Sequence, residues 1–222
     1  MIDIEALEFG YPRGDFRLRV SRFRVAAGEK VAVTGPSGSG KTTLLNLLAG
    51  IATADRGALR VAGENVGALG DAARRAFRIT RIGFVFQDFE LVEYLTVIDN
   101  ILHPYRISRA LTLDAEVRRR AGRLAERLGI DDKLARGVGE LSQGERQRVA
   151  ICRAVLPHPK LLLADEATGN LDPDNKFRIL DLLFAEADEV GASVLAVTHD
   201  HALLPRFDRV VDFSEFRSRA EA

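Results

Sequence analysis

The sequence has few of the residues that many kinds of site require. It contains one cysteine, Cys152, so no disulfide can form within the chain and a zinc site would need other ligands. No apolar run approaches the ~18 residues of a membrane-spanning helix, and residues 1–5 lack the basic and apolar regions of a signal peptide. Lysine and arginine number 32, as do aspartate and glutamate, so there is no net basic charge to displace counterions from nucleic acid. We therefore expect a soluble, cytosolic protein without a nucleic-acid partner.

The composition that is present is typical of a globular protein. The 222 residues are 46% hydrophobic, and a chain of this length buries roughly 70–75% of its unfolded surface. Cys152 has the apolar neighbours Ala150, Ile151 and Val155, which predict a buried thiol. Three consecutive arginines at 118–120 are expected to form one solvated helix face.

The hydrophobic pattern changes its period along the chain. Apolar residues at every second position from Phe16 onward predict antiparallel strands with one face in water. The leucine spacing within 41–48 predicts a helix, which Gly50 closes. Residues 91–137 contain no long β-branched run and are expected to be mostly helical.

The final third alternates between apolar strands and a helix. Strands are predicted at 161–164, 193–197 and 210–213, with a helix after Pro173. Such alternation implies a parallel sheet that is covered on both faces. The sequence therefore predicts an α/β protein with a mostly parallel sheet core, an N-terminal antiparallel β edge and an inserted helical segment.

A complete phosphate-binding loop follows a short strand predicted at 29–34. The pattern G-x-x-x-x-G-K-[ST] is matched by Gly35, Pro36, Ser37, Gly38, Ser39, Gly40, Lys41 and Thr42. Its glycines let backbone N–H groups surround an anion, and the following helix adds its positive end. Lys41 supplies a charge for the β- and γ-phosphates, and the Thr42 hydroxyl can ligate Mg²⁺. We include Thr43 in this site; a chance glycine-rich turn is the alternative, which the flanking strand and helix disfavour.

Two acids follow the strand predicted at 161–164. Asp165 at the strand end can reach Mg²⁺, and Glu166 can polarise an attacking water. The pair could instead be a solvated strand end. Their position beyond a buried strand favours function, because parallel α/β sheets bind ligands at that edge.

Together these motifs resemble those of the nucleotide-binding subunits of ABC (ATP-binding cassette) transporters over nearly the whole chain. Leu141-Ser142-Gln143-Gly144-Glu145 stands where that family has its signature, Leu-Ser-Gly-Gly-Gln. Gln87 matches the Q-loop glutamine, which implies a ligand of Mg²⁺ and water. Asn170-Leu171-Asp172 is similar to the D-loop, and His199 to the switch histidine. Tyr11 stands where the family stacks an aromatic ring on adenine.

The resemblance implies a single P-loop NTPase domain of the ABC type over residues 1–222. Residues 1–87 and 160–222 would form a RecA-like core with the β edge, and 88–159 a helical subdomain that carries the signature. An ATPase with ATP and Mg²⁺ as cofactors follows. The implied catalytic residues are Glu166, His199 and Gln87, and the implied Mg²⁺ ligands are Thr42, Gln87 and Asp165.

The signature is also informative by itself. Ser142 and Glu145 form an S-x-x-E capping box for a helix that begins near Gln143. Such a helix tip is a second anion site, although the phosphate-binding loop of the same chain already holds the phosphates. In the family, two subunits pair head to tail, and each signature helix covers the ATP of the other. This implies Ser142, Gln143, Gly144 and Asp172 as nucleotide-binding residues; Ser142 could also simply cap its own helix.

Three positions depart from the family pattern. Gln143 replaces the first signature glycine, and Glu145 replaces the terminal glutamine. Ala167 stands where relatives usually have proline after the catalytic glutamate. These changes affect the expected rate more than the expected function, because Gly144 and the acidic pair are retained.

Within the family, residues 164–172 and 82–87 are similar to the lipoprotein-releasing, macrolide-export and cell-division ATPases. This implies a separate integral membrane subunit, contacted by residues between Phe89 and Tyr94, and a peripheral location on the inner face of the cell membrane. Core packing is the alternative for Phe89, Leu91 and Tyr94. Two other functions stay open: an ABC ATPase that regulates an envelope enzyme or cell division, and a soluble one that acts on DNA or ribosomes. The second lacks support, because the chain has no zinc cysteines, second cassette or basic excess.

Overall fold

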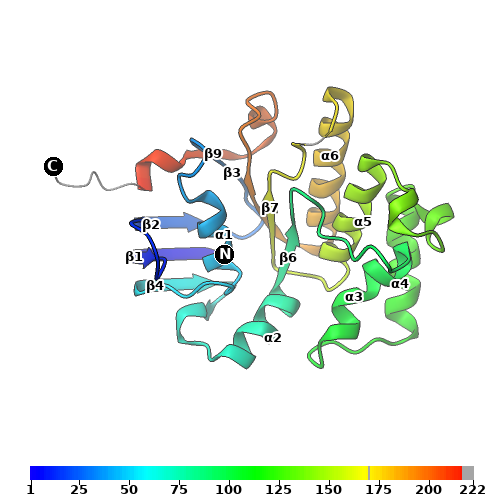
Figure 1. Cartoon of the computed structure of the whole chain (residues 1–222), viewed down its shortest axis with the longest axis horizontal. Coiled ribbons are helices and arrows are strands. Elements are labelled where there is room, and N and C mark those ends of the chain that lie inside the picture. Colours follow the sequence, from blue (N-terminus) through cyan, green and yellow to red (C-terminus); the bar gives the residue numbers. More distant parts are fainter. Residues whose placement is uncertain (170, 217–222) are drawn as a thin grey trace.

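The computed structural model describes residues 1–169 and 171–216, which form two β-sheets and a group of helices (Figure 1). The smaller sheet is antiparallel with the order β2-β1-β4-β5. Its strands are β1 (Ile2–Gly10), β2 (Arg17–Val25), β4 (Arg56–Val61) and β5 (Glu64–Asn65). β1 pairs with β2 from Ile2 opposite Val25 to Gly10 opposite Arg17, which confirms the predicted antiparallel β edge.

The larger sheet is parallel, with the order β6-β7-β8-β3-β9. Its strands are β3 (Lys30–Thr34), β6 (Ile82–Val85), β7 (Leu161–Asp165), β8 (Ser193–Val197) and β9 (Arg209–Asp212). Because all five run in the same direction, the loops that follow them emerge at one edge. The predicted parallel α/β core is confirmed.

The α-helices occupy both faces of this sheet and the space beyond it (Figure 1). They are α1 (Lys41–Leu48), α2 (Asp71–Arg81), α3 (Val97–Ile107), α4 (Ala115–Arg127), α5 (Gln143–Val155) and α6 (Pro173–Val190). Short 3₁₀ helices lie at Val66–Ala68, Asp131–Lys133, Val138–Glu140, Leu204–Arg206 and Phe213–Phe216. Among the described residues, no helix is both long and apolar enough to cross a lipid bilayer.

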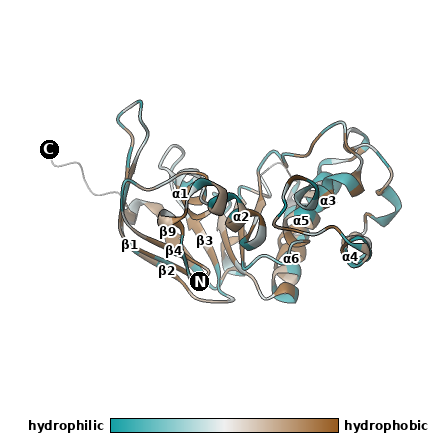
Figure 2. Ribbon diagram, turned by 90° about the horizontal axis from the view of Figure 1, so that it is seen from below, coloured by the Kyte–Doolittle hydropathy of each residue, from teal (hydrophilic) through white to brown (hydrophobic). Residues whose placement is uncertain are grey.

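Alternate residues of β7 face two different hydrophobic cores. Leu161 and Leu163 lie in a core that joins both sheets to α1, whereas Leu162 and Ala164 face a core built with helices α3 to α6. The hydropathy view shows α1 beside the strands and the helices from α3 onward gathered at the other end of the molecule (Figure 2). The parallel sheet is therefore covered on both faces, and its polar loops are left at its edges.

Three features differ from, or add to, the sequence-based expectation. The strands β4 and β5 and helix α2 were not predicted. Arg120 is half-buried, not part of a solvated arginine face, because its guanidinium donates to the Tyr105 hydroxyl at 2.6 Å and the Leu156 carbonyl at 2.7 Å. Cys152 is fully buried as predicted, and burial raises the pKa of its thiol.

Candidate functional site

Four of the predicted site segments follow parallel strands and therefore meet at one edge of the sheet. Gly35 follows β3, Gln87 follows β6, Asp165 ends β7 and His199 follows β8. Because β7, β8 and β3 are neighbours, the loops after them lie side by side. This is the edge at which open α/β sheets bind ligands.

The Gly35–Gly40 loop has a backbone that side chains would disturb. Gly38 and Gly40 have φ angles of 70° and 107°, in the left-handed region that favours glycine. A Cβ at Gly40 would also lie 2.6 Å from the Phe16 ring. The tip of the loop, Pro36 to Gly38, is exposed, which leaves the backbone N–H groups of Ser37 and Gly38 accessible to an anion.

Lys41 lies across the loop that it follows. Its side chain is buried, and Nζ donates to the carbonyls of Gly35 and Pro36, both at 2.8 Å. Ser39 Oγ is also buried and has no hydrogen-bond partner among the described residues. A cation and an unsatisfied hydroxyl are thus held within one loop, a combination that suits phosphate oxygens.

The N-terminus of α1 has no side-chain cap. Gly40 takes the N-cap position in the left-handed conformation, and the first turn contains no acidic residue. The first N–H groups of the helix and its positive dipole end are therefore available to a ligand. In this first turn, Thr43 Oγ1 lies 3.1 Å from the hydroxyl of Tyr11, whose ring is 42% exposed.

Asp165 and Glu166 lie opposite this loop. Burial raises the pKa of the Asp165 carboxyl, while a hydrogen bond from Thr42 opposes the shift. Glu166 has a φ angle of 47°, which is rare for a residue with a side chain, and its N–H donates to the Val197 carbonyl at 3.0 Å. This backbone brings Glu166 Oε2 within 3.2 Å of His199 Nδ1.

Gln87 reaches the same place from β6. A Cβ built on Gly169 would lie 3.9 Å from Gln87 Nε2 and 3.8 Å from Glu166 Oε2, so both side chains face this glycine. The structure thus brings Gln87, Glu166 and His199 together, although they come from three different strands.

The phosphate-binding loop borders a cleft of about 350 Å³. Its lining residues are Tyr11, Phe16, Ser37, Gly38, Gly40, Lys41, Thr42, Thr43, Glu166 and Val197. Phe16 and Val197 were not predicted as site residues. Phe16 is part of the alternating pattern in sequence, but it precedes β2 and its ring packs on Gly40 and, at a centroid distance of 5.7 Å, on Tyr11. The cleft thus has a wide aromatic side next to the loop.

The signature residues lie elsewhere. Ser142, Gln143, Gly144 and Glu145 border a second hollow of about 450 Å³ with Leu171, Asp172 and Asn175. None of these residues lines the cleft beside the phosphate-binding loop. Asp172 caps α6 by accepting from the Asn175 N–H at 3.1 Å, while Asn170, the first residue predicted for the D-loop, lies outside the described residues.

The capping box predicted at the signature is confirmed. Ser142 Oγ accepts from the Glu145 N–H at 3.3 Å, and Glu145 Oε2 accepts from both the N–H and the hydroxyl of Ser142 at 2.8 Å. These two bonds hold the pKa of the Glu145 carboxyl below its usual range, with help from Lys133 at 3.6 Å. An ionised carboxylate therefore lies at the tip of α5.

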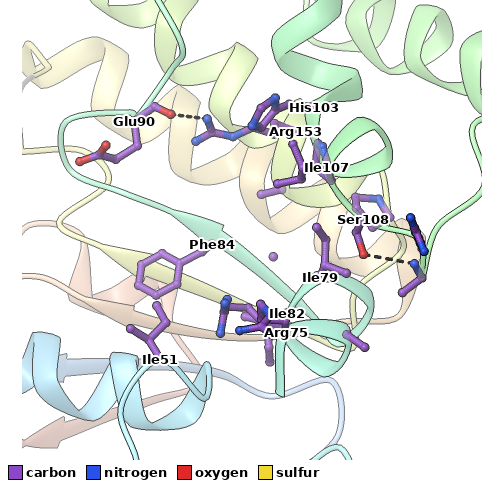
Figure 3. Close-up of a pocket in the computed structure, with 18 of the residues that line it drawn as sticks. Ile51, Arg75, Ile79, Ile82, Phe84, Glu90, His103, Ile107, Ser108 and Arg153 are labelled. Carbon is purple, nitrogen blue, oxygen red and sulfur yellow. Dashed lines mark hydrogen bonds between the residues drawn. The ribbon is translucent and has the colours of Figure 1, made fainter. Parts of the chain in front are cut away.

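A third and larger cavity, of about 680 Å³, lies between α2, β6, α3 and the end of α5 (Figure 3). Ile51 and Ile107 expose apolar side chains there, and Arg75, His103 and Arg153 add polar groups. The segment predicted to contact a membrane subunit runs beside it with mixed burial: Phe89 is buried, whereas Tyr94 is 89% exposed.

Comparison with known proteins gives a consistent result. Residues 18–169 match the ABC transporter family. The chain is 44% identical over 188 residues to the lipoprotein-releasing system ATP-binding protein LolD of Pseudomonas fluorescens, which covers 85% of this chain and 82% of that protein. It is 41% identical over 214 residues to the macrolide export ATP-binding/permease protein MacB of Rhodopirellula baltica, with 95% of this chain and 31% of that protein covered.

The fold is similar to a solved structure as well. The dimeric post-hydrolysis state of the ATP-binding cassette MJ0796, bound to ADP and Pi, matches with a TM-score of 0.84 and 29% sequence identity. The match covers 96% of this chain and 94% of that one.

Proposed function

This chain belongs to the ABC transporter family, and from that premise we propose that its phosphate-binding cleft hydrolyses Mg²⁺-ATP to drive a separate membrane protein of the lipoprotein-releasing and macrolide-export type. Membership makes it an ATP-binding, ATP-hydrolysing subunit that pairs with a second cassette and a membrane partner. The observation that carries the detailed proposal is the convergence of the Gly35–Thr43 loop, Gln87, Glu166 and His199 at one sheet edge.

The nucleotide would lie along this edge. Backbone N–H groups of the loop tip and the start of α1 bind the phosphates, with Lys41 moving from the loop carbonyls to the β- and γ-phosphates. Tyr11 offers its exposed ring to adenine, and its hydroxyl bond to Thr43 fixes the ring beside the loop. The aromatic side of the cleft then binds the base, and the polar side binds the phosphates.

The residues present also fit Mg²⁺. Thr42 and Asp165 are hydrogen-bonded to each other and supply hard oxygen ligands, and Gln87 can add a third from β6. Within the described part of the chain, no group of three or more His, Cys, Asp or Glu side chains could hold a metal. In phosphate sites Mg²⁺ is usually held by one or two carboxylates together with the phosphates, and Asp165 supplies such a carboxylate here. When bound, Mg²⁺ would neutralise charge on the β- and γ-phosphate oxygens.

The catalytic step needs a group that activates water. We assign this role to Glu166, whose carboxylate accepts the proton of the attacking water. His199, with Nδ1 at 3.2 Å from that carboxylate, orients it and faces the γ-phosphate from the opposite side. Gln87, whose side chain faces Gly169 as Glu166 does, would bind the attacking water and would ligate Mg²⁺ when the ion is bound.

A second copy would complete the site. The signature tip at Ser142 borders a hollow that shares no lining residue with the cleft at the phosphate-binding loop. This separation supports contact between Ser142, Gln143 and Gly144 of one chain and a γ-phosphate bound to the loop of another. Asp172 lines the same hollow and would contact the nucleotide there. We infer a head-to-tail dimer in which ATP connects both chains.

The membrane partner would bind at the groove beside α3. Exposed Ile51 and Ile107 offer apolar contacts (Figure 3). Among the described residues that line the groove, Glu90 is the one acid, and Arg75, Arg78 and Arg109 are basic. These features suit an amphipathic segment with acidic residues, and MacB, whose name joins ATP binding to a permease, extends well beyond the part that this chain covers. We infer a cytoplasmic protein held on the inner face of the membrane by this contact.

The test is the variant Glu166→Gln. It should bind ATP, hydrolyse it about 10²- to 10⁴-fold more slowly and elute as a dimer with ATP but not with ADP. The matched control is Glu189→Gln, an exposed carboxylate on α6, which should turn over ATP at the wild-type rate. A Glu166→Gln protein with wild-type turnover would contradict the catalytic assignment. One that stays monomeric with saturating ATP, even with the membrane subunit added, would contradict the head-to-tail dimer.

A further inference from the structure

The segment that joins the parallel sheet to the helices turns sharply just after Gln87. Phe89 and Glu90 have φ angles of 63° and 48°, so two consecutive residues with side chains adopt the left-handed conformation. The turn closes on itself, with the Phe89 N–H donating to Phe86 at 3.2 Å and the Glu90 N–H to Asp88 at 2.7 Å. Such a backbone persists only where the surrounding structure holds it.

The side chain of Arg153, on α5, holds this turn in place. Arg153, near the end of α5, donates from Nη2 to the Phe89 carbonyl at 2.6 Å and from Nη1 to the Glu90 carbonyl. Figure 3 shows this guanidinium reaching from α5 to the backbone of Glu90 at the edge of the groove. Within the described residues no carboxylate forms an ion pair with Arg153, so its bonds to this turn are made to backbone carbonyls. Burial lowers the pKa of the Arg153 guanidinium, and the nearby Glu90 carboxylate opposes this shift.

Arg153 lies on α5, the same helix whose N-terminus carries the signature residues Ser142 to Glu145. Gln143 and Arg153 are ten residues apart on α5, which places them about 15 Å apart along one rigid element. A displacement of the signature tip thus moves the guanidinium, and the guanidinium moves the carbonyls of Phe89 and Glu90. Only two residues, Gln87 and Asp88, separate this fixed pair from Phe86, which directly follows β6.

We propose that Arg153 is a positioning residue for the ATPase reaction: it fixes the turn after Gln87 to the signature helix, so that closure at Ser142 and placement of Gln87 beside Glu166 occur together. This rests on the role proposed for Gln87. Arg153 also lines the groove proposed for the membrane partner.

The experiment compares Arg153→Met and Arg153→Lys with Arg120→Met. Arg120 is the matched control, because its guanidinium also donates twice within the helical part, to Tyr105 and Leu156, but does not touch the turn. We expect Arg153→Met to lower kcat about 10- to 100-fold with little change in KM for ATP. Amide hydrogen exchange at Phe89 and Glu90 should accelerate. Arg153→Lys should show both effects more weakly, whereas Arg120→Met should lower Tm without either.

Several outcomes would overturn the proposal. The proposal is wrong if a folded Arg153→Met protein has the wild-type kcat and the wild-type rate of amide hydrogen exchange at Phe89 and Glu90. Another such outcome is an equal loss of kcat in Arg120→Met, which would indicate general loosening. If Arg153→Met does not fold, Arg153→Lys decides by the same two readouts. The variant Gln87→Ala distinguishes the role of Gln87 from that of Arg153. If Gln87→Ala turns over ATP at the wild-type rate, the role proposed for Gln87 is wrong. Hydrogen exchange in Arg153→Met still tests whether Arg153 holds the turn at Phe89 and Glu90.

Discussion

The two helix N-termini at the proposed site differ in how they satisfy their own backbone. Helix α1 starts at Gly40 with no side-chain cap, no acid in its first turn and Lys41 bound to loop carbonyls. Helix α5 starts at Ser142 with a complete capping box and the ionised carboxylate of Glu145 at its tip. Within the described residues, the first helix end therefore has no side-chain cap to compete with an anion, whereas at the second the N–H groups of Ser142 and Glu145 already have partners.

From this difference we infer an order of events for the proposed site. An anion should bind more favourably at α1, where uncapped N–H groups and Lys41 are available, than at α5. At α5 it must displace the Glu145 carboxylate from the Ser142 hydroxyl. ATP would therefore bind first to the loop of one chain. Contact with α5 of the partner then needs the additional energy of the dimer interface, so closure is reversible once the γ-phosphate is gone.

Lys41→Ala would remove the charge that distinguishes α1. We expect kcat/KM for ATP to fall at least ~100-fold, since a preorganised donor to phosphate charge is worth about that much in rate. The fold should survive, because Lys41 binds only carbonyls of its own loop in the described structure. Steady-state ATPase assays and thermal unfolding measure the two effects.

The control for this prediction is Lys160→Ala, an exposed lysine before β7. It should keep wild-type turnover. A folded Lys41→Ala protein that hydrolyses ATP as the wild type does would show that the Gly35–Thr42 loop is not the phosphate site.

Tyr11→Ala would test the aromatic side of the same cleft. The expected effect is smaller, a rise in KM for ATP with kcat nearly unchanged, because stacking on a base contributes ~1–3 kcal/mol and the ring lies on the aromatic side of the cleft, which we assign to the base. Tyr11→Phe is the control: it keeps the ring and loses only the bond to Thr43. If Tyr11→Ala lowers the affinity for inorganic triphosphate as much as the affinity for ATP, the ring does not bind the base.

Local motifs could be predicted from the sequence because the residues that form each of them are close together in the chain. The Gly35–Thr42 loop, the acids after β7 and the Ser142 capping box each depend on residues that are neighbours in the chain. Strand β7 and helix α1 were predicted for the same reason: β7 is a continuous apolar run, and α1 has leucines at helical spacing.

The parts that could not be predicted depend on distant or irregular contacts. Helix α2 buries only Phe77, and the other residues of its apolar face are mostly alanines set between arginines, so this face is a weak signal in the sequence. Strand β4 buries only Leu59 and Val61. Arg153 escapes any motif because its partners are backbone carbonyls more than sixty residues earlier in the chain. Phe16 has the period of a strand, and only the fold places its ring on Gly40.

The variant Glu145→Gln, at the N-terminus of α5, should have the smallest effect of these substitutions. It should lower the free energy of unfolding by ~0.3–1 kcal/mol at neutral pH, because a carboxylate near a helix N-terminus stabilises it by about that amount. Since folding lowers the pKa of this carboxyl, its stabilisation is present above pH 4.5, its ordinary pKa, and is lost as the pH falls below that value. The stability difference between wild type and variant should therefore narrow below pH 4.5. Urea unfolding at a series of pH values measures it.

The same variant should act in the opposite direction on the dimer. Removing the negative charge beside Ser142 lets the γ-phosphate reach that hydroxyl with less repulsion, so in the Glu166→Gln background the ATP-bound dimer should dissociate less on dilution. Asp114→Asn is the matched control, because Asp114 caps α4 through the Val117 N–H at 2.8 Å, away from the signature hollow. It should lose stability without a tighter dimer. If Glu145→Gln weakens the dimer as much as it weakens the fold, the carboxylate at the tip of α5 supports closure, and the order of events inferred from the two helix ends is wrong.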